Sequence, residues 1–259
     1  MRFEHAVLID AEACIGCGLC RDDCPAGNIV VEDGKARVLA QDCIMCGHCV
    51  AICPRAAVSM TGFDGEPQKI EEPMALDENA LLVALRSRRS IRRFADRAVE
   101  PAVVERVIEA GRLAPTGSNA QDVSYVVLQG AGKDEAEAYA VRLFRRVLPL
   151  AKLVSSLARR VDVGDRFFFK GAPVALAVVA KDEVDGALAA ANMALMAEAC
   201  GLGVLYSGFF VTATRFSFSL RRLLGLRRGQ RVVALLVIGY PAVRYRRSAP
   251  KEPAYVRRP

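Results

Sequence analysis

The chain contains one cysteine run twice, as Cys14-Ile-Gly-Cys-Gly-Leu-Cys-Arg-Asp-Asp-Cys-Pro25 and again as Cys43-Ile-Met-Cys-Gly-His-Cys-Val-Ala-Ile-Cys-Pro54. Together the two copies hold eight of its nine cysteines. Each copy reads C-x2-C-x2-C-x3-C-P, a spacing that is typical of thiolates holding 4Fe–4S clusters. The two-residue gaps let a tight loop turn three sulfurs toward one cluster. A segment of about sixty residues buries little core on its own, so we expect two clusters to stabilise a small domain at residues 1–60.

Zinc and disulfide bonds are the two alternatives for these cysteines. Zinc ribbons use two CxxC pairs, which leaves the third cysteine of each run and the closing Cys-Pro unexplained. Disulfides need an oxidising compartment, and residues 1–10 include Arg2, Glu4 and His5 without the long apolar stretch of a secretory signal. His48 stands in a gap position where four thiolates are already available, so we expect it to be a spacer or a hydrogen-bonding residue.

Composition and charge change after residue 60. Residues 61–75 read as a linker that contains glycines and prolines and few apolar residues, and residues 76–259 are numerous enough to build a full core. Residues 1–60 carry eight acidic and five basic side chains, a net charge of −3, whereas residues 61–259 carry 21 acidic and 31 basic side chains, a net charge of +10.

The basic part of the chain shows neither a nucleic-acid motif nor a membrane segment. Its arginine pairs are scattered, so we expect no nucleic-acid partner. The longest apolar runs, residues 172–180 and 232–238, fall far short of the roughly 18 residues that span a bilayer. We therefore expect a cytoplasmic protein that has no membrane partner.

Hydrophobic periodicity predicts alternating helices and strands after residue 76. We expect helices after a cap at Asp77, over 100–113, over 135–160 with an interruption at Pro149, and over 185–201. We expect strands over 124–128, 174–179 and 232–240, and a polar loop over 114–121. Phe167-Phe-Phe169 reads as core packing, with a substrate wall or a dimer contact as alternatives, and Cys200 reads as a packing residue.

Four segments of this part resemble the FMN-dependent nitroreductase family. They are Arg88-Arg-Ser-Ile-Arg-Arg-Phe94, Ala114-Pro-Thr-Gly-Ser-Asn-Ala-Gln121, Ala197-Glu-Ala-Cys-Gly-Leu-Gly203 with Ser207-Gly208, and Ile238-Gly-Tyr-Pro241. With its cysteine runs, the chain resembles a ferredoxin–nitroreductase fusion. The resemblance implies an α+β fold, in which a ferredoxin-like two-cluster domain precedes a three-layer domain with a central mixed β-sheet flanked by helices.

The ferredoxin resemblance implies a crossed set of cluster ligands. In two-cluster ferredoxins the fourth cysteine of each run ligates the other cluster. One 4Fe–4S cluster is then expected on Cys14, Cys17, Cys20 and Cys53, and the second on Cys43, Cys46, Cys49 and Cys24.

The nitroreductase resemblance implies one FMN and suggests its contacts. Arg88 and Ser90 match residues that bind the phosphate, where a guanidinium gives a charge-assisted contact, and Arg89 lies between them. Arg92 matches a basic residue at the pyrimidine edge, where a cation stabilises charge on the reduced flavin. Ser207 and Gly208 match a segment whose backbone amides face flavin N5 and O4.

The resemblance also implies flavin contacts from one loop and from the C-terminal tail. Asn119 matches an amide that hydrogen-bonds the flavin, and Pro115 and Thr116 match a loop that packs on it from the partner subunit. The other candidates are Gln121 in this loop and Arg247 and Lys251 in the tail, near a second phosphate-binding pair. A solvated charge run and an ordinary turn are the alternatives for residues 88–94 and 114–121. The sequence Asp122-Val-Ser-Tyr125 departs from the family's Pro-Trp, which leaves the local pocket wall open.

The resemblance implies an FMN-dependent reductase, active as a homodimer with FMN at the interface. Electrons would pass from two 4Fe–4S clusters to the FMN, and from the FMN to a small electron-poor acceptor such as a nitroaromatic, a quinone or an enone. No catalytic side chain is expected, because the flavin carries the chemistry. Reduced ferredoxin, flavodoxin or NAD(P)H is the expected donor. The alternatives are another flavin reaction (oxidation, dehalogenation or cofactor maturation) and a non-catalytic electron carrier between proteins.

Overall fold

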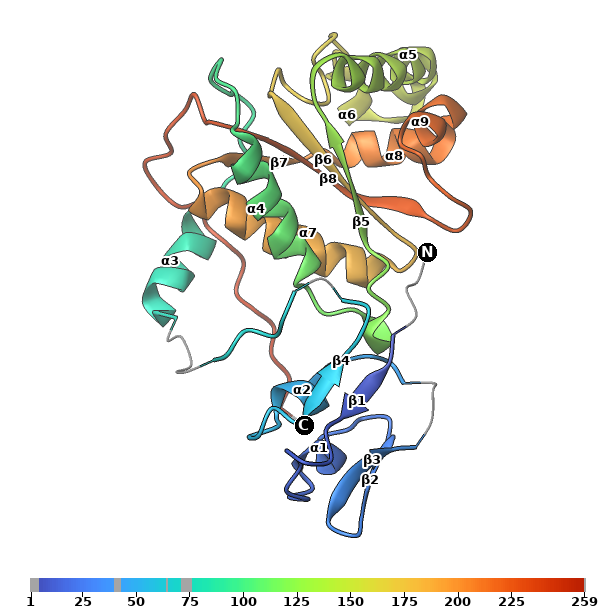
Figure 1. Cartoon of the computed structure of the whole chain (residues 1–259). Helices are drawn as coiled ribbons and strands as arrows, with labels where there is room; N and C mark the ends of the chain where they lie inside the picture. Colours follow the sequence, from blue (N-terminus) through green and yellow to red (C-terminus); the bar gives the residue numbers. More distant parts are fainter. Residues whose placement is uncertain (1–4, 40–42, 64, 71–75, 259) are drawn as a thin grey trace. The chain divides into compact units, whose positions relative to one another are not determined.

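The computed structural model describes residues 5–39, 43–63, 65–70 and 76–258, which form two compact units (Figure 1). The first unit comprises Met1–Ala75 and, from further along the chain, Gly117–Ala120; the second comprises Leu76–Thr116 and Gln121–Pro259. Positions 64 and 71–75 of the predicted linker lie outside the described residues. Among the helices described, none is both long enough and apolar enough to cross a membrane.

The first unit is built from two similar halves. Each half has a short helix that begins directly after a left-handed glycine: α1 (Leu19–Asp22) follows Gly18 and α2 (His48–Ala51) follows Gly47. Two antiparallel pairs complete the unit, β1 (Val7–Ile9) with β4 (Val58–Met60) and β2 (Ile29–Glu32) with β3 (Lys35–Val38). Its small core is formed by Cys20, Ile29, Cys49 and Val58.

The second unit contains a four-stranded sheet in the order β5-β6-β8-β7. The strands are β5 (Ser124–Leu128), β6 (Val174–Ala180), β7 (Gly203–Tyr206) and β8 (Arg231–Gly239), and their pairs are antiparallel. Among the residues that the structure describes, a bridge between Ser90 and Val204 is the parallel component. The predicted strands correspond to β5, β6 and β8, whereas β7 was missed.

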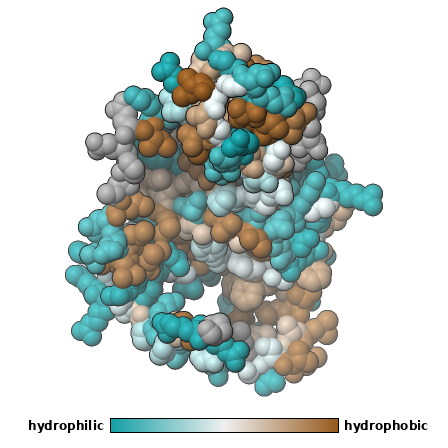
Figure 2. Space-filling model, turned by 90° about the horizontal axis from the view of Figure 1, so that it is seen from below, coloured by the Kyte–Doolittle hydropathy of each residue, from teal (hydrophilic) through white to brown (hydrophobic). Residues whose placement is uncertain are grey.

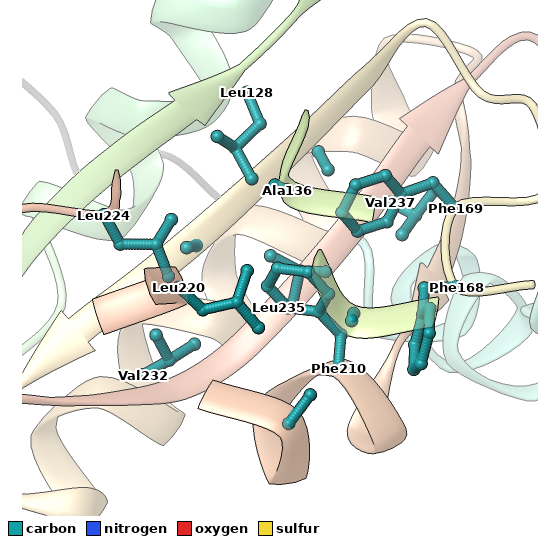
Figure 3. Close-up of a cluster of buried hydrophobic side chains, with 14 of the residues drawn as sticks. Leu128, Ala136, Phe168, Phe169, Phe210, Leu220, Leu224, Val232, Leu235 and Val237 are labelled. Carbon is teal, nitrogen blue, oxygen red and sulfur yellow. The ribbon is translucent and has the colours of Figure 1, made fainter. Parts of the chain in front are cut away.

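Helices cover both faces of this sheet, which confirms the predicted three-layer α+β architecture (Figure 1). Along β6, Val174, Leu176 and Val178 face a core formed with α4 (Pro101–Arg112) and α7 (Glu183–Ala199). The alternating residues Ala175, Ala177 and Val179 face the opposite core, because successive side chains of a strand point to opposite faces. That second core is formed with α5 (Gly130–Val154), α8 (Gly208–Phe216) and α9 (Phe218–Leu223). In Figure 3, Phe168, Phe169 and Phe210 pack near Leu235 and Val237 in this second core.

Helix starts follow the capping residues, but one predicted break is wrong. Asp77 caps α3 (Glu78–Ser87) as predicted, since its carboxylate accepts a hydrogen bond from Ala80 N at 2.6 Å. The predicted interruption at Pro149 does not occur, because α5 runs through it to Val154 before the short α6 (Ser156–Arg159). A proline removes only one hydrogen bond of the helix ladder, which can bend a helix without ending it.

Candidate cofactor sites

Two cavities in the first unit collect the eight cysteines of the repeated run. One is lined by Cys14, Cys17, Cys20 and Cys53, and the other by Cys24, Cys43, Cys46 and Cys49. Each cavity thus takes three thiols from one run and the fourth from the other, the grouping that the ferredoxin resemblance implies. None of the nine cysteines, all of which lie in the described part of the chain, forms a disulfide bond, which contradicts the disulfide alternative.

Backbone amides point at the sulfurs of both cavities. The N–H of Asn28 donates to Cys24 Sγ and that of Ala57 to Cys53 Sγ, both at 3.3 Å. The N–H of Ala36 donates to Cys14 Sγ and that of Met45 to Cys43 Sγ, both at 3.4 Å. The amides of Ala36 and Gly16 lower the pKa of the Cys14 thiol, whereas burial raises the pKa of Cys20 and Cys49. Hydrogen bonds to sulfur are a principal means by which a protein stabilises a charged iron–sulfur cluster, so the donor set fits two such clusters.

In the second unit, the predicted phosphate-binding segment lies beside β7. The backbone N–H of Ile91 donates to Val204 O at 3.0 Å, and that of Ala95 donates to Tyr240 O at 2.8 Å. Gly203 permits this approach, because a β-carbon at Gly203 would lie 2.8 Å from Ile91 Cβ. The glycine therefore serves close packing.

A cavity of about 570 Å³ opens next to this segment. It brings together Arg92, Ser207 and Gly208, three of the predicted flavin contacts. Ser207 is the N-cap of α8, and its own N–H donates to Leu235 O at 2.9 Å, while that of Phe210 donates to Ser207 O at 3.1 Å. The N–H groups of Gly208 and Phe209, which line the cavity, have no acceptor within the helix. Such groups suit an electron-rich ligand atom.

Seven further residues complete the cavity wall, and for Phe167 and Phe168 among them a substrate wall was one of the predicted alternatives. They are Phe167, Phe168, Lys170, Leu205, Tyr206, Phe209 and Thr212. Phe168 and Phe169 are also almost completely buried in the core, which confirms the predicted packing role for these two. The signal for this wall in the sequence is the run of three consecutive phenylalanines, Phe167-Phe-Phe169.

Arg88 has an unsatisfied donor at the other end of the same segment. Its Nη1 atom is buried without a hydrogen-bond partner, and so is Oε1 of Glu198. Burial raises the pKa of Glu198, and the charge of Arg88 opposes this shift. An orphaned guanidinium N–H is a group that a phosphate oxygen would satisfy, so the residues present fit the phosphate of FMN.

The C-terminal tail returns to this segment. Arg89 Nη2 donates to Ala249 O at 3.3 Å, and Tyr245 Oη donates to Ser90 O at 3.5 Å. Arg247 and Lys251 are exposed residues of this tail. Their phosphate-binding role stays a prediction, as do those of Arg89 and Ser90.

The predicted loop 114–121 is divided between the units. Pro115 and Thr116 belong to the second unit, where Thr116 Oγ1 accepts a hydrogen bond from Gln121 N at 3.0 Å. Asn119 belongs to the first unit, where its side chain donates to Ile44 O and Met45 O. Flavin contacts of these four residues stay predictions.

Comparisons with known proteins identify both parts. Residues 85–240 match the nitroreductase family, and residues 6–54 match the 4Fe-4S dicluster domain. A protein of Archaeoglobus fulgidus, provisionally named NADH dehydrogenase/NAD(P)H nitroreductase, is 29% identical over 157 residues, which are 60% of this chain and 82% of that protein.

Two solved structures share the fold of the second unit. A nitroreductase with bound FMN from Bacteroides fragilis has a TM-score of 0.56 at 19% identity, with 70% of this chain and 98% of that chain covered. A BluB-like flavoprotein from Clostridium difficile has a TM-score of 0.56 at 20% identity, with 68% and 99% covered. Because the family match spans more than half of the 259 residues, the chain belongs to the nitroreductase family and carries a 4Fe–4S dicluster domain before it.

Proposed function

We propose that this protein is an oxidoreductase that uses FMN and two 4Fe–4S clusters to reduce a small electron-poor molecule. The observation that carries the proposal is the cavity of about 570 Å³ at Arg92, Ser207 and Gly208 in a chain of the nitroreductase family. Its size falls in the usual range of small-molecule sites, about 300–1,000 Å³. FMN is also the ligand named for the Bacteroides fragilis structure that shares the fold.

The chain's own groups would hold the flavin at three points. The guanidinium of Arg88 offers an unsatisfied donor to the phosphate. Arg92 supplies a positive charge at the cavity, which favours negative charge that develops on a bound ligand. The amides of Gly208 and Phe209 at the start of α8 would supply hydrogen bonds that need no side chain. When bound, FMN supplies one- and two-electron transfer.

The aromatic wall would bind the acceptor. Phe167, Phe168 and Phe209 line the cavity, and Lys170 places its ammonium 4.6 Å from the Phe167 ring centroid. Rings of this kind stack on flat conjugated molecules, and a cation favours acceptors that gain negative charge. A nitroaromatic, a quinone or an enone has this chemistry. Room for such a molecule favours an enzyme over a carrier between proteins.

An anaerobic reduction experiment tests the proposal. The purified protein is mixed with NADH, NADPH or reduced ferredoxin, and the flavin and cluster absorbance bands are followed before and after an acceptor is added. We expect one donor to bleach both chromophores and a nitroaromatic or quinone to restore them. A protein without flavin, or one whose reduced flavin none of these acceptors reoxidises, would contradict the proposal.

A further inference from the structure

The segment Gly117–Ala120 belongs to the first unit, although its chain neighbours on both sides belong to the second. Ser118 and Asn119 have φ angles of 48° and 52°, in the left-handed region. Residues with side chains avoid this region unless surrounding contacts hold them there. For Asn119 those contacts come from a cysteine loop more than seventy residues earlier in the chain.

The carboxamide of Asn119 holds the loop between Cys43 and Cys46. Its Nδ2 donates to Ile44 O at 3.1 Å and to Met45 O at 2.6 Å, and these are the two residues of the gap. Because both partners are carbonyl oxygens, the amide must present its NH₂ group to them. The loop therefore depends on a side chain from outside the cysteine run.

The held loop delivers a hydrogen bond to a thiol. Met45 has a φ of 53°, and in this conformation its N–H donates to Cys43 Sγ at 3.4 Å. Turning the Ile44–Met45 backbone away would move this N–H from the sulfur. Asn119 thus acts on Cys43 through Met45.

The first cysteine run holds the equivalent loop in a different way. Gly16 occupies the position of Met45, and a β-carbon there would collide with Gly34 O in the β2–β3 turn. The amide of Gly16 acts on the thiol of Cys14, as that of Met45 does on Cys43, and Cys14 Sγ also receives the N–H of Ala36 on β3 at 3.4 Å. The first loop is therefore fixed by a hairpin of its own half, whereas the second is fixed by Asn119.

We propose that Asn119 is a positioning residue for the cluster of Cys43, Cys46, Cys49 and Cys24, and that it raises the reduction potential of that cluster. The inference rests on the cluster assignment of the proposed function. Reduction adds one electron and therefore negative charge to the cluster, and an N–H aimed at a ligating sulfur stabilises that charge. Asn119 keeps the Met45 N–H so aimed. Since Thr116 and Gln121 flank the segment, the loop that sets this potential is continuous with the nitroreductase domain.

Redox titration of the full-length protein tests this inference. Asn119→Ala and Asn119→Leu both remove the two donors, and Leu nearly preserves the volume. Ser118→Ala is the matched control, because Ser118 is an exposed residue of the same left-handed turn. Iron and sulfide are measured first, and about eight of each per chain are expected in every variant. The midpoint potentials of both clusters are then measured by electron paramagnetic resonance.

Both Asn119 variants should shift one midpoint to a more negative potential and leave the other unchanged, and Ser118→Ala should shift neither. Unchanged midpoints in both Asn119 variants, or equal shifts of both clusters, would overturn the inference. A fall in FMN affinity with unchanged potentials would make Asn119 a flavin contact only, and would also overturn it. A wild-type protein without iron would refute the proposed function itself, whereas eight irons with unaltered potentials would refute only the role of Asn119.

Discussion

At the residue scale, Glu137 connects the core to the cavity wall. This residue of α5 is only 6% exposed, and its Oε1 accepts hydrogen bonds from Phe168 N at 2.9 Å and Phe169 N at 2.7 Å. It therefore fixes the backbone of the aromatic segment. Burial raises the pKa of its carboxyl group, and the two amides only partly oppose the shift.

The raised pKa of Glu137 predicts a pH-dependent contribution to stability. The folded state binds the proton of Glu137 more tightly than the unfolded state does, so protonation of this residue adds to the free energy of unfolding. This contribution is fully present below the unfolded pKa, near pH 4, and is lost as pH rises through the folded pKa. Glu137→Gln removes this titration. The melting temperature of the wild type minus that of the variant should fall as pH is raised from about 4 and then level off. A difference that grows with pH would contradict the assignment.

Arg88 allows a test of flavin binding with a matched arginine. Arg88→Ala removes a charge-assisted contact worth roughly 1.5–3 kcal/mol, so FMN affinity should fall roughly 10- to 150-fold. Arg86→Ala is the control, since Arg86 is an exposed residue in the last turn of α3. Titration of the apoprotein with FMN, followed by flavin fluorescence, gives both affinities. Equal affinities in the two variants would remove Arg88 from the site.

At the element scale, the contact between β7 and the segment around Ile91 depends on one glycine. Gly203→Ala would place a β-carbon against Ile91, so the segment must move away from β7. We expect weaker FMN binding together with a lower melting temperature. Gly132→Ala is the control, because Gly132 lies in α5 and a β-carbon there has no neighbour within 4 Å. An FMN affinity as high in Gly203→Ala as in the control would show that the segment does not position the flavin.

The helix α3 has no buried residue, and we predict that it contacts a second copy of the chain in a dimer. Leu81, Leu82, Val83 and Leu85 are each at least 41% exposed. On the face drawn in Figure 2, hydrophobic side chains gather in patches between hydrophilic ones. Because a second copy would cover the apolar side of α3, light scattering should give twice the 28.0 kDa of the chain. Leu85→Arg should shift the protein toward monomer, and a wild-type monomer containing FMN would rule the dimer out.

Elements with a strong local pattern were predictable, and those defined by their neighbours were not. The buried strands β6 and β8 and the capped helix α3 follow from apolar runs and from Asp77. The strand β7 has only four residues, which is too short a run to tell a strand from the end of the preceding helical segment, and its pairing with β8 defines it. At Pro149 the local rule predicted a break that the helix does not make.

At the scale of the whole molecule, the cavities unite residues that lie far apart in the sequence. Cys24 joins Cys43, and Cys53 joins Cys14, as the resemblance implied. The flavin candidates Arg92 and Ser207 were also recognised from motifs. Lys170, Phe209 and Thr212 could not be found in this way, because only the folding of α8 against the aromatic segment brings them to the same wall. The same holds for Asn119, whose partners are set by tertiary structure.

The joining of a cluster domain to a nitroreductase domain predicts that electrons reach the flavin through the clusters. Covalent linkage keeps the carrier near its acceptor at a high effective concentration, so no diffusional encounter is needed. The net charges, −3 for residues 1–60 and +10 for residues 61–259, also attract, although exposed charges are screened over about 8 Å at physiological salt. Damage to one cluster should therefore interrupt the supply of electrons without removing the flavin.

Cys46→Ala in the full-length protein tests this route, with Cys200→Ser as the matched cysteine control. Cys46 lines a cluster cavity, whereas Cys200 ends α7 and packs against the core of the second unit. We expect Cys46→Ala to keep its FMN and its activity with a chemical reductant that reduces flavin directly, and to lose turnover with reduced ferredoxin. Cys200→Ser should keep both activities and its full iron content. If Cys46→Ala turns over normally with reduced ferredoxin although it has lost iron, that cluster lies outside the electron path, and the role of its domain is structural or regulatory.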